Sequence, residues 1–593
     1  MSRNRIIAVA VATLGLLAGS ATAATFTWAA PSNGNWSVAM NWTNGSAPNA
    51  GGDPSHVLFF GDNGTPYTST DDLAGAFLLN RLQLSSASGA ANSIAGTPLV
   101  FTADGPTMPR LDYTAGANGS FTIRNNLTFS NDTTFGGAAA GGTVTLSGAL
   151  TNRGALSLGG AYTLTITNVN NNFAGPLVAS NSAGGVLRAE NGGLYQAGGS
   201  LNGTGTITVL SGTVSTPHGF MFGVGAANNR SALLTGSGSM WTSGVASSYF
   251  YVGSWGSHDN TFTVSSNAQL AFGSTYSYIG NGAGAQRNSL IVTNGGQATL
   301  WGNSTFGVAT LSSNNLLVVT GTNSAFYSKG SYSINICDCG QDNRMVVTDG
   351  GLFTNVAGLT VSFPGSINSG NAMNNSVLVS NGGRMFLNGY LDLAISGYGG
   401  SAGWNHSNTV AVTGPDSLLS FGAIVRVGWA YYHGGTSRWC RLTIDDHATA
   451  TNMSSASAWY VSMNTPNSGY PAWLDHNSVV VTNGGKLFLG SGGRLYIGYG
   501  PLADSNTVEV TDPESLVDCG GGNIYVGSSN VCNALTVRNG GTVTNVGTLT
   551  VCSNNVVNLY GGAVAATILT NQPNAQIGVD LVSPGAMTIQ GNA

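Results

Sequence analysis

Short runs of alternating apolar and polar residues recur along the second half of the chain, each introduced by an asparagine and closed by glycines. The clearest run is Asn477–Gly485, Asn-Ser-Val-Val-Val-Thr-Asn-Gly-Gly. Alternation with a period of two is typical of a β-strand with one buried face. The residue five places after the asparagine, here called the anchor, recurs about every 30 residues from Thr235 to Tyr560. The asparagines are Asn260, Asn288, Asn315, Asn343, Asn375, Asn408, Asn477, Asn506, Asn533 and Asn555.

Two further strand-like segments follow most of these runs, one after the glycines and one ending in a small residue, as in Tyr496-Ile497-Gly498. Three short strands per repeat, without the spacing of apolar residues that helices show, predict an all-β parallel β-helix (β-solenoid) with one coil per repeat. Stacked coils bury an apolar row that one coil cannot bury alone. We expect the asparagine side chains to hydrogen-bond from coil to coil, and the paired glycines to form the next corner with positive φ.

The pattern divides the chain into four parts. Residues 1–23 have a basic start, an apolar stretch and the small-residue sequence Ala21-Thr22-Ala23, which predicts a secretory signal peptide. We expect residues 24–119, with Trp28, Trp36 and Trp42, to form an N-terminal β-rich cap, because an uncovered solenoid end is an open strand edge. Residues 120–219 are expected to form irregular coils, and residues 220–593 about twelve regular coils. No matching polar cap is evident near Ala593, so we expect a truncated sequence or an end covered by a partner.

Composition narrows the class of protein further. Charged residues make up 7% of the chain while hydrophobic residues make up 42%, and this balance excludes an intrinsically disordered chain. The net charge of −5, with lysine only at Lys329 and Lys486, argues against a nucleic-acid partner. No apolar run after the signal peptide is long enough for a transmembrane helix. Asparagine, serine, threonine and glycine are abundant, as expected for strands joined by tight turns.

A family resemblance accompanies these patterns. The spacing of Trp28, Trp36 and Trp42 resembles the start of secreted bacterial proteins with autotransporter-associated β-strand repeats. The Gly/Asn/Thr-rich stretch 140–215 is similar to those repeats, and the coils from residue 220 resemble autotransporter passenger domains with a pectin-lyase-like solenoid. The resemblance implies secretion or display on the outer surface of a Gram-negative bacterium. It supplies no catalytic residue.

The carboxylates that look most reactive in the sequence are Asp445 and Asp446, followed by His447. However, Asp446 occupies the place directly after an anchor, and Asp349, Asp512 and several asparagines occupy the same place in other repeats. An aspartate there is expected to form an Asx-turn. Asp445 replaces an anchor threonine and keeps a weaker claim on function. We therefore assign no catalytic residue.

The sequence gives no clear metal site and does not determine how the cysteines pair. Aspartates near the repeat asparagines could supply oxygen ligands for Ca²⁺, but the glycine- and aspartate-containing nonapeptide of calcium-binding solenoids is missing, so solvated loop carboxylates are favoured. We predict no metal and no cofactor. The six cysteines allow fifteen disulfide pairings, among which Cys532–Cys552 is weakly favoured because both lie at similar corners of successive coils.

The segment from each closing glycine to the next repeat asparagine varies most in length and should project from one edge of the solenoid. Aromatic and histidine residues gather there, and we call them the aromatic ridge. Aromatic faces with few charges suit binding of sugars or protein surfaces, whereas the alternative is that they only shield the solenoid edge. The ridge consists of Trp255, His258, Trp404, His406, Trp429, Tyr431, Tyr432, His433, Trp439, Tyr470, Trp473 and His476.

Together these features favour an exported structural or adhesive protein, with polysaccharide or cell-surface proteins as its partners, over an enzyme. Two alternatives stay open at this point. One is a polysaccharide lyase or glycoside hydrolase built on the same β-helix, and the other is a passive fragment of a longer surface array. The oligomeric state is open as well.

Overall fold

The computed structural model describes residues 23–590 with internal gaps. The gaps are 115–118, 138–140, 169–170, 174–176, 181–185, 190–206, 212, 216–218, 225–227, 230, 244–248, 274–275, 307–311, 332, 364–370, 397–402, 431–434, 456, 466–471 and 580–581. The expected signal peptide therefore lies almost wholly outside the described residues. Within the described ranges, no helix is both long and apolar enough to cross a membrane.

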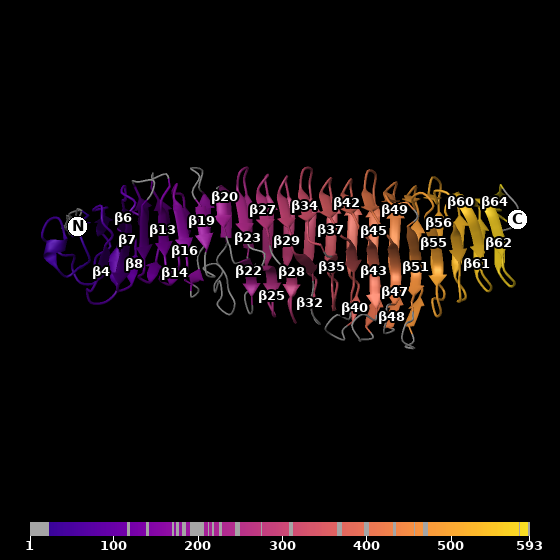
Figure 1. The fold of residues 1–593 in the computed structure, drawn as a ribbon, viewed down its shortest axis with the longest axis horizontal. Coiled ribbons are helices and arrows are strands. Elements are labelled where there is room, and N and C mark those ends of the chain that lie inside the picture. The colour runs from indigo at the N-terminus through magenta and orange to yellow at the C-terminus, as the bar shows by residue number, and fades with distance from the viewer. Residues whose placement is uncertain are drawn as a thin grey trace, which may run out of the picture.

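The protein is a rod in which strands stack one above another across the long axis, with the two ends of the chain at opposite ends of the rod (Figure 1). Every ladder between named strands is parallel, and successive strands of a ladder come from successive coils. The predicted fold class, a parallel β-helix, is confirmed. A single 3₁₀ turn, η1 (Ala39–Asn41), is the one helical element that the described residues form.

The first ladder runs the whole length of the rod, and from coil to coil its strands contain the alternating runs of the sequence pattern. Its strands are β1 (Thr25–Trp28), β3 (Val57–Phe60), β6 (Arg81–Leu84), β9 (Arg110–Tyr113), β12 (Thr133–Gly136), β15 (Leu156–Leu158), β18 (Leu177–Ser180), β20 (Ile207–Ser211), β23 (Ser231–Thr235), β26 (Thr261–Ser265), β29 (Ser289–Thr293), β33 (Leu316–Thr320), β37 (Arg344–Thr348), β41 (Ser376–Ser380), β45 (Thr409–Thr413), β49 (Arg441–Asp445), β53 (Ser478–Val481), β56 (Thr507–Thr511), β59 (Ala534–Arg538), β61 (Val556–Tyr560) and β63 (Gln576–Val579).

A second ladder packs against the first from the other side of the core. Over the regular coils it includes β24 (Met240–Ser243), β27 (Gln269–Phe272), β30 (Gln297–Leu300), β34 (Ala325–Ser328), β38 (Leu352–Asn355), β42 (Arg384–Leu387), β46 (Leu418–Phe421), β50 (Thr449–Asn452), β54 (Lys486–Phe488) and β57 (Leu516–Asp518).

A third ladder completes each coil. It comprises β22 (Gly219–Val224), β25 (Tyr249–Ser254), β28 (Tyr276–Asn281), β31 (Asn303–Phe306), β35 (Ile334–Ile336), β39 (Leu359–Val361), β43 (Leu391–Ser396), β47 (Val425–Ala430), β51 (Ala458–Asn464), β55 (Arg494–Tyr499) and β58 (Ile524–Val526). The long strand β60 (Thr542–Val551) pairs with both β57 and β58 and so joins the second and third ladders near the C-terminal end.

A short fourth sheet appears between the third ladder and the next repeat asparagine. Its six strands are β32 (Ser312–Ser313), β36 (Gly340–Gln341), β40 (Ala372–Met373), β44 (Trp404–His406), β48 (Gly435–Arg438) and β52 (Ala472–Asp475). These strands lie in the segments of variable length, where a projecting loop was expected. Among the predicted aromatic ridge, Trp404, His406 and Trp473 lie on β44 and β52, and Trp439 and His476 directly follow β48 and β52.

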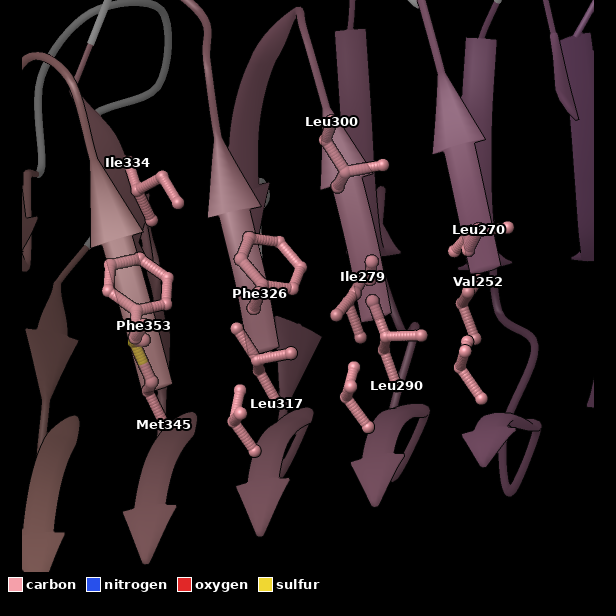
Figure 2. Close-up of a cluster of buried hydrophobic side chains, with 14 of the residues drawn as sticks. Val252, Leu270, Ile279, Leu290, Leu300, Leu317, Phe326, Ile334, Met345 and Phe353 are labelled. Atoms are coloured by element: carbon pink, nitrogen blue, oxygen red, sulfur yellow. The ribbon is translucent and has the colours of Figure 1, made fainter. Parts of the chain in front are cut away.

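The core is one continuous column of apolar side chains along the rod axis. In Figure 2, Leu290, Leu317 and Met345 from the first ladder face side chains such as Phe326 and Phe353 from the second. Strand side chains alternate in direction, so each coil contributes every second residue to this column. The spacing of the valines and leucines in the sequence therefore follows directly from the fold.

Residues 24–119, which we expected to form an N-terminal β-rich cap, contribute strands to the ladder of the later coils. Strands β1, β3, β6 and β9 belong to the same parallel ladder as all later coils, so the solenoid begins at Thr25. Trp28, Trp36 and Trp42 are buried in this first part, and their rings pack edge to face at 5.3 Å and 5.8 Å between centroids. The tryptophans thus fill the end of the core inside the solenoid.

Candidate functional site

A ladder of buried asparagine side chains marks the corner where each coil enters its first strand. Asn260 Nδ2 donates to Asn288 Oδ1 at 2.8 Å, and Asn288 Nδ2 donates to Asn315 Oδ1 at 3.1 Å. Each Oδ1 also accepts from a backbone N–H of the preceding coil, as in Asn288 N to Asn315 Oδ1 at 3.1 Å. The same amide-to-amide bonds link Asn315, Asn343, Asn375 and Asn408 in turn, and then Asn506, Asn533 and Asn555.

Cys440 interrupts this ladder. Asn408 Nδ2 meets the Cys440 sulfur at 4.0 Å, while the Cys440 backbone N–H still donates to Asn477 Oδ1 at 3.0 Å. A thiol is a weaker acceptor than an amide oxygen, so the step from Asn408 to Cys440 is weaker than its neighbours. The interruption falls among the coils that carry the aromatic ridge.

The residue directly before each ladder position has a left-handed backbone, with φ between 52° and 62° in eleven successive coils. Seven of the eleven are asparagine, aspartate or serine, of which asparagine and aspartate tolerate this conformation best. The other four are Arg287, Trp439, His476 and Cys532, of which Trp439 and His476 lie in neighbouring coils. Strained backbone positions that hold bulky residues are found most often at binding and catalytic sites, which draws attention to this region.

Two tryptophans form the walls of an open slot on the fourth sheet. Trp404 of β44, Thr436 of β48 and Trp473 of β52 occupy the same position in three successive strands. Trp404 is 61% exposed and Trp473 is 50% exposed. Two strand spacings separate them, about 9.6 Å, with the shorter threonine between. We call this the tryptophan slot. It is part of a cavity of about 430 Å³ that His406, Arg438 and Trp439 also line.

A third indole closes one side of the slot. The Trp439 ring lies 4.4 Å from the His406 ring and 5.6 Å from the His476 ring, so three rings from three coils form a row. The Arg438 guanidinium lies 5.9 Å from the Trp439 ring centre and donates to Asp475 Oδ2 at 2.6 Å. The lining of the slot therefore combines aromatic faces with the Arg438 cation, which Asp475 pairs from outside the lining, and the Thr436 hydroxyl.

The rest of the predicted aromatic ridge lies elsewhere. Trp255, which is 56% exposed, and His258, which pairs with Asp259 at 2.7 Å, belong to an earlier coil. Trp429 lies on β47, in the third ladder, where the Arg426 guanidinium stacks on its ring at 3.6 Å. Tyr431, Tyr432, His433 and Tyr470 are outside the described residues. The structure thus brings together Trp404, His406, Trp439, Trp473 and His476, and separates Trp429 and Trp255 from them.

The carboxylates flagged in the sequence occupy a tight turn. Asp446 and His447 have φ of 48° and 61°, and the residues in the same place of other repeats, such as Asn483, also have positive φ. The Asp445 carboxylate accepts from the Asn483 amide at 2.9 Å. Asp512 occupies the place of Asp446 in a later repeat. It accepts a hydrogen bond from the Thr482 hydroxyl at 2.6 Å, and this bond lowers the pKa of the Asp512 carboxyl. These contacts fit turns that link neighbouring coils.

Sequence reasoning missed a second group of polar residues on the third ladder. Asp392 and Asp338 line a cavity of about 490 Å³ there, together with Arg426. Arg426 binds Asp392 through two nitrogens and so occupies that carboxylate. Burial raises the pKa of Asp338 to about 7. In the sequence, each of these residues is a polar residue in or just after the third strand-like segment of its repeat. That these residues form one group can be recognised only when the repeats are aligned coil by coil.

Cys532 and Cys552, which the sequence weakly favoured as a disulfide pair, are not bonded to each other. Cys532 is exposed, Cys552 is buried, and both are free thiols. Cys532 is also one of the residues with a left-handed backbone ahead of a ladder asparagine. Across the described ranges, no three His, Cys, Asp or Glu side chains come close enough together to hold a metal ion.

Geometry thus defines the class of protein as a parallel β-helix with an aromatic slot on one edge. No protein-family model matches the chain, and no curated protein matches it. One solved structure is similar: a crystal structure described as a TibC-catalysed hyper-glycosylated TibA fragment, residues 55–350. It covers 65% of this chain and all of its own length at 16% sequence identity, with a TM-score of 0.22. A superposition at this score supports no inference about function.

Proposed function

We propose that this protein is an exported β-helix, displayed on the outer surface of a Gram-negative cell or secreted from it, that adheres to carbohydrate through the tryptophan slot. The observation that carries the proposal is the placement of Trp404 and Trp473 at one strand position two coils apart, both exposed, with Thr436 between them. A rigid rod with a site on one edge suits display and attachment.

The chemistry of the slot favours a sugar over a protein surface. The apolar faces of a pyranose ring stack on indoles, and its hydroxyl groups need donors and acceptors at the rim. Arg438 and Thr436, which line the slot, supply both. The strands that carry the two indoles lie about 9.6 Å apart, a spacing that suits one sugar ring better than a broad, flat surface.

Backbone strain beside the tryptophan slot gives independent support for a binding site there. Trp439 and His476 stand where seven of the other nine coils carry asparagine, aspartate or serine, and the left-handed backbone of Trp439 costs about 1 kcal/mol. A residue chosen for stability alone would relieve that cost. Their rings instead line and extend the slot.

The test is a glycan array followed by calorimetric titration of the sugars it identifies. We expect the Trp404→Ala/Trp473→Ala variant to bind at least tenfold more weakly, because each stacked ring contributes on the order of 1 kcal/mol. Trp301→Ala is the matched control, since Trp301 is also about half exposed but packs with Lys329 on another coil. Equal binding by wild type and the double variant, or binding of proteins without any sugar, would overturn the proposal.

Incubation of the same protein with polysaccharides distinguishes an adhesive protein from an enzyme built on this scaffold. Incubation with plant, algal and bacterial polysaccharides should leave their chain lengths unchanged. New reducing ends or unsaturated products would favour a hydrolase or lyase. Of the two carboxylates in the third-ladder cavity, Asp392 is already bound by Arg426, so a catalytic pair would lack one member.

A further inference from the structure

The third ladder presents one outward side chain per coil, and these side chains form a straight column along the rod. Strand pairing aligns eleven of them in consecutive coils. Every member carries a hydroxyl, amide, carboxylate or guanidinium group, while the next residue in each strand points into the apolar core. The column is Tyr251, Tyr278, Thr305, Asn335, Thr360, Asp392, Arg426, Tyr460, Tyr496, Tyr525 and Thr550.

The middle of this column is the floor of a groove. Thr305, Thr360 and Asp392 are short, nearly buried side chains, whereas the longer Tyr278 and Arg426 stand at either end. The cavity of about 490 Å³ at this place is lined by residues from six successive coils, from β28 to β47. At about 4.8 Å per coil, the five steps between Tyr278 and Arg426 span about 24 Å. We call this the polar groove.

Aromatic rings border both ends of the polar groove. Tyr276 stacks on Tyr249 with a 12° angle between rings, and lies 6.0 Å from Tyr278. At the other end, the Arg426 guanidinium lies 3.6 Å from the Trp429 ring centre and 5.6 Å from that of Tyr390. These flat surfaces suit the apolar faces of sugar rings.

The charges inside the polar groove nearly cancel. Arg426 and Asp392 neutralise each other through their two-nitrogen contact. Asp338 accepts a hydrogen bond from Asn335 at 3.3 Å, and burial raises its pKa to about 7, which favours its neutral form in weakly acidic surroundings. Such a groove offers many hydrogen bonds and no excess positive charge, so a polyanion finds no counter-charge there.

We propose that the polar groove binds a linear, neutral polysaccharide that lies along the rod axis with about one sugar unit per coil. An extended chain of 1,4-linked pyranoses advances by nearly the same distance per unit as the solenoid advances per coil. Successive units therefore meet successive polar side chains at one repeated spacing. This site is separate from the tryptophan slot, and the inference does not depend on what the slot binds.

Calorimetric titration with neutral β-1,4-linked oligosaccharides of glucose, mannose and xylose, from two to six units, tests the proposal on the full chain. We expect affinity in one series to rise with each added unit and to level off at about five units, where the groove ends. Polygalacturonate should bind at least tenfold more weakly than the best neutral chain. Absence of binding in all three series, a hexamer that binds no tighter than a dimer, or tighter binding of polygalacturonate would overturn it.

Substitutions locate the binding on the column. Asn335→Ala/Thr360→Val removes two polar groups from the floor and should weaken hexamer binding about tenfold. Thr354→Val is the matched control, because Thr354 points outward from β38 on a different face. In the Trp404→Ala/Trp473→Ala variant, which removes binding at the slot, affinity should still rise with chain length from dimer to hexamer. Full hexamer binding by the floor variant, or loss of it in the slot variant, would refute a separate groove site.

Discussion

Replacing Asn315 by alanine tests how much the asparagine ladder stabilises the solenoid. The Asn315 amide makes five buried hydrogen bonds. Its Oδ1 accepts from the backbone and side-chain nitrogens of Asn288, both at 3.1 Å. Its Nδ2 shares two hydrogens among three acceptors, Asn343 Oδ1 at 3.0 Å, the Ala285 carbonyl at 3.1 Å and the Ser312 hydroxyl at 3.0 Å. Alanine removes all of them and leaves a small void.

The cost follows from the groups that lose their partner. The backbone N–H of Asn288 is left without an acceptor inside the protein, and each buried group of this kind costs about 1–3 kcal/mol. Other partners keep second bonds, as Asn288 Nδ2 does to the Ser257 carbonyl at 3.2 Å. We therefore expect a loss of about 3 kcal/mol, centred on two neighbouring coils.

Hydrogen exchange read by mass spectrometry is the suitable assay, because a solenoid can open locally without unfolding as a whole. The peptide containing the Asn288 amide should exchange roughly a hundredfold faster in the variant, while peptides from β1 and β3 stay unchanged. Gln297→Ala removes an exposed amide from the same coil and serves as control. Unchanged exchange at Asn288, or an equal effect in the Gln297 variant, would refute the ladder as a stabilising element.

Three further predictions concern single sites. Trp439→Asn should change the free energy of unfolding by less than about 1 kcal/mol, because relief of backbone strain offsets the lost ring contacts. The same variant should bind glycan more weakly, because it lacks the ring. Urea denaturation measures the first effect and calorimetric titration the second. Cys440→Asn should add about 1 kcal/mol by completing the ladder, measured as slower exchange at the Asn408 amide. Asp338→Asn should stabilise the protein by up to about 4 kcal/mol at pH 8 and very little at pH 4. Burial raises the folded-state pKa of Asp338 to about 7, so the cost of its charge develops between those values and appears in denaturation curves at the two pH values.

The fold was predictable because every regular coil places the same requirements on its strand and corner residues, so the same pattern recurs in the sequence. A strand that buries one face must alternate, as Ser478–Val481 does, and a corner repeated in every coil selects the same residue type each time, which is why the ladder asparagines stand out. The first coils were harder to recognise. His56 and Pro109 stand in place of the asparagine before β3 and β9, and the Asn80 amide before β6 donates to backbone carbonyls, so no asparagine ladder marks these coils.

The candidate sites were predictable in part, for a geometric reason. Trp404 and Trp473 lie in segments of variable length, and composition alone was enough to single them out. Trp429 was grouped with them although its strand continues through Gly428 and carries it to the third ladder. The polar groove escaped notice because Asn335, Thr360 and Asp392 are unevenly spaced along the chain, and only the pairing of strands shows that they stand in line.

The weak step at Cys440 has a consequence for how the rod would respond to mechanical tension. A cell held at one end and a glycan held in the tryptophan slot would load the contacts between coils in series, and a ladder step without an amide-to-amide bond resists less than a step that has one. The Asn408–Cys440 step lies between the coils that carry Trp404 and Trp473. Separation there would part the two walls of the slot and release the sugar while the rest of the rod stays intact. Attachment would then fail at the site of grip before the rod itself breaks.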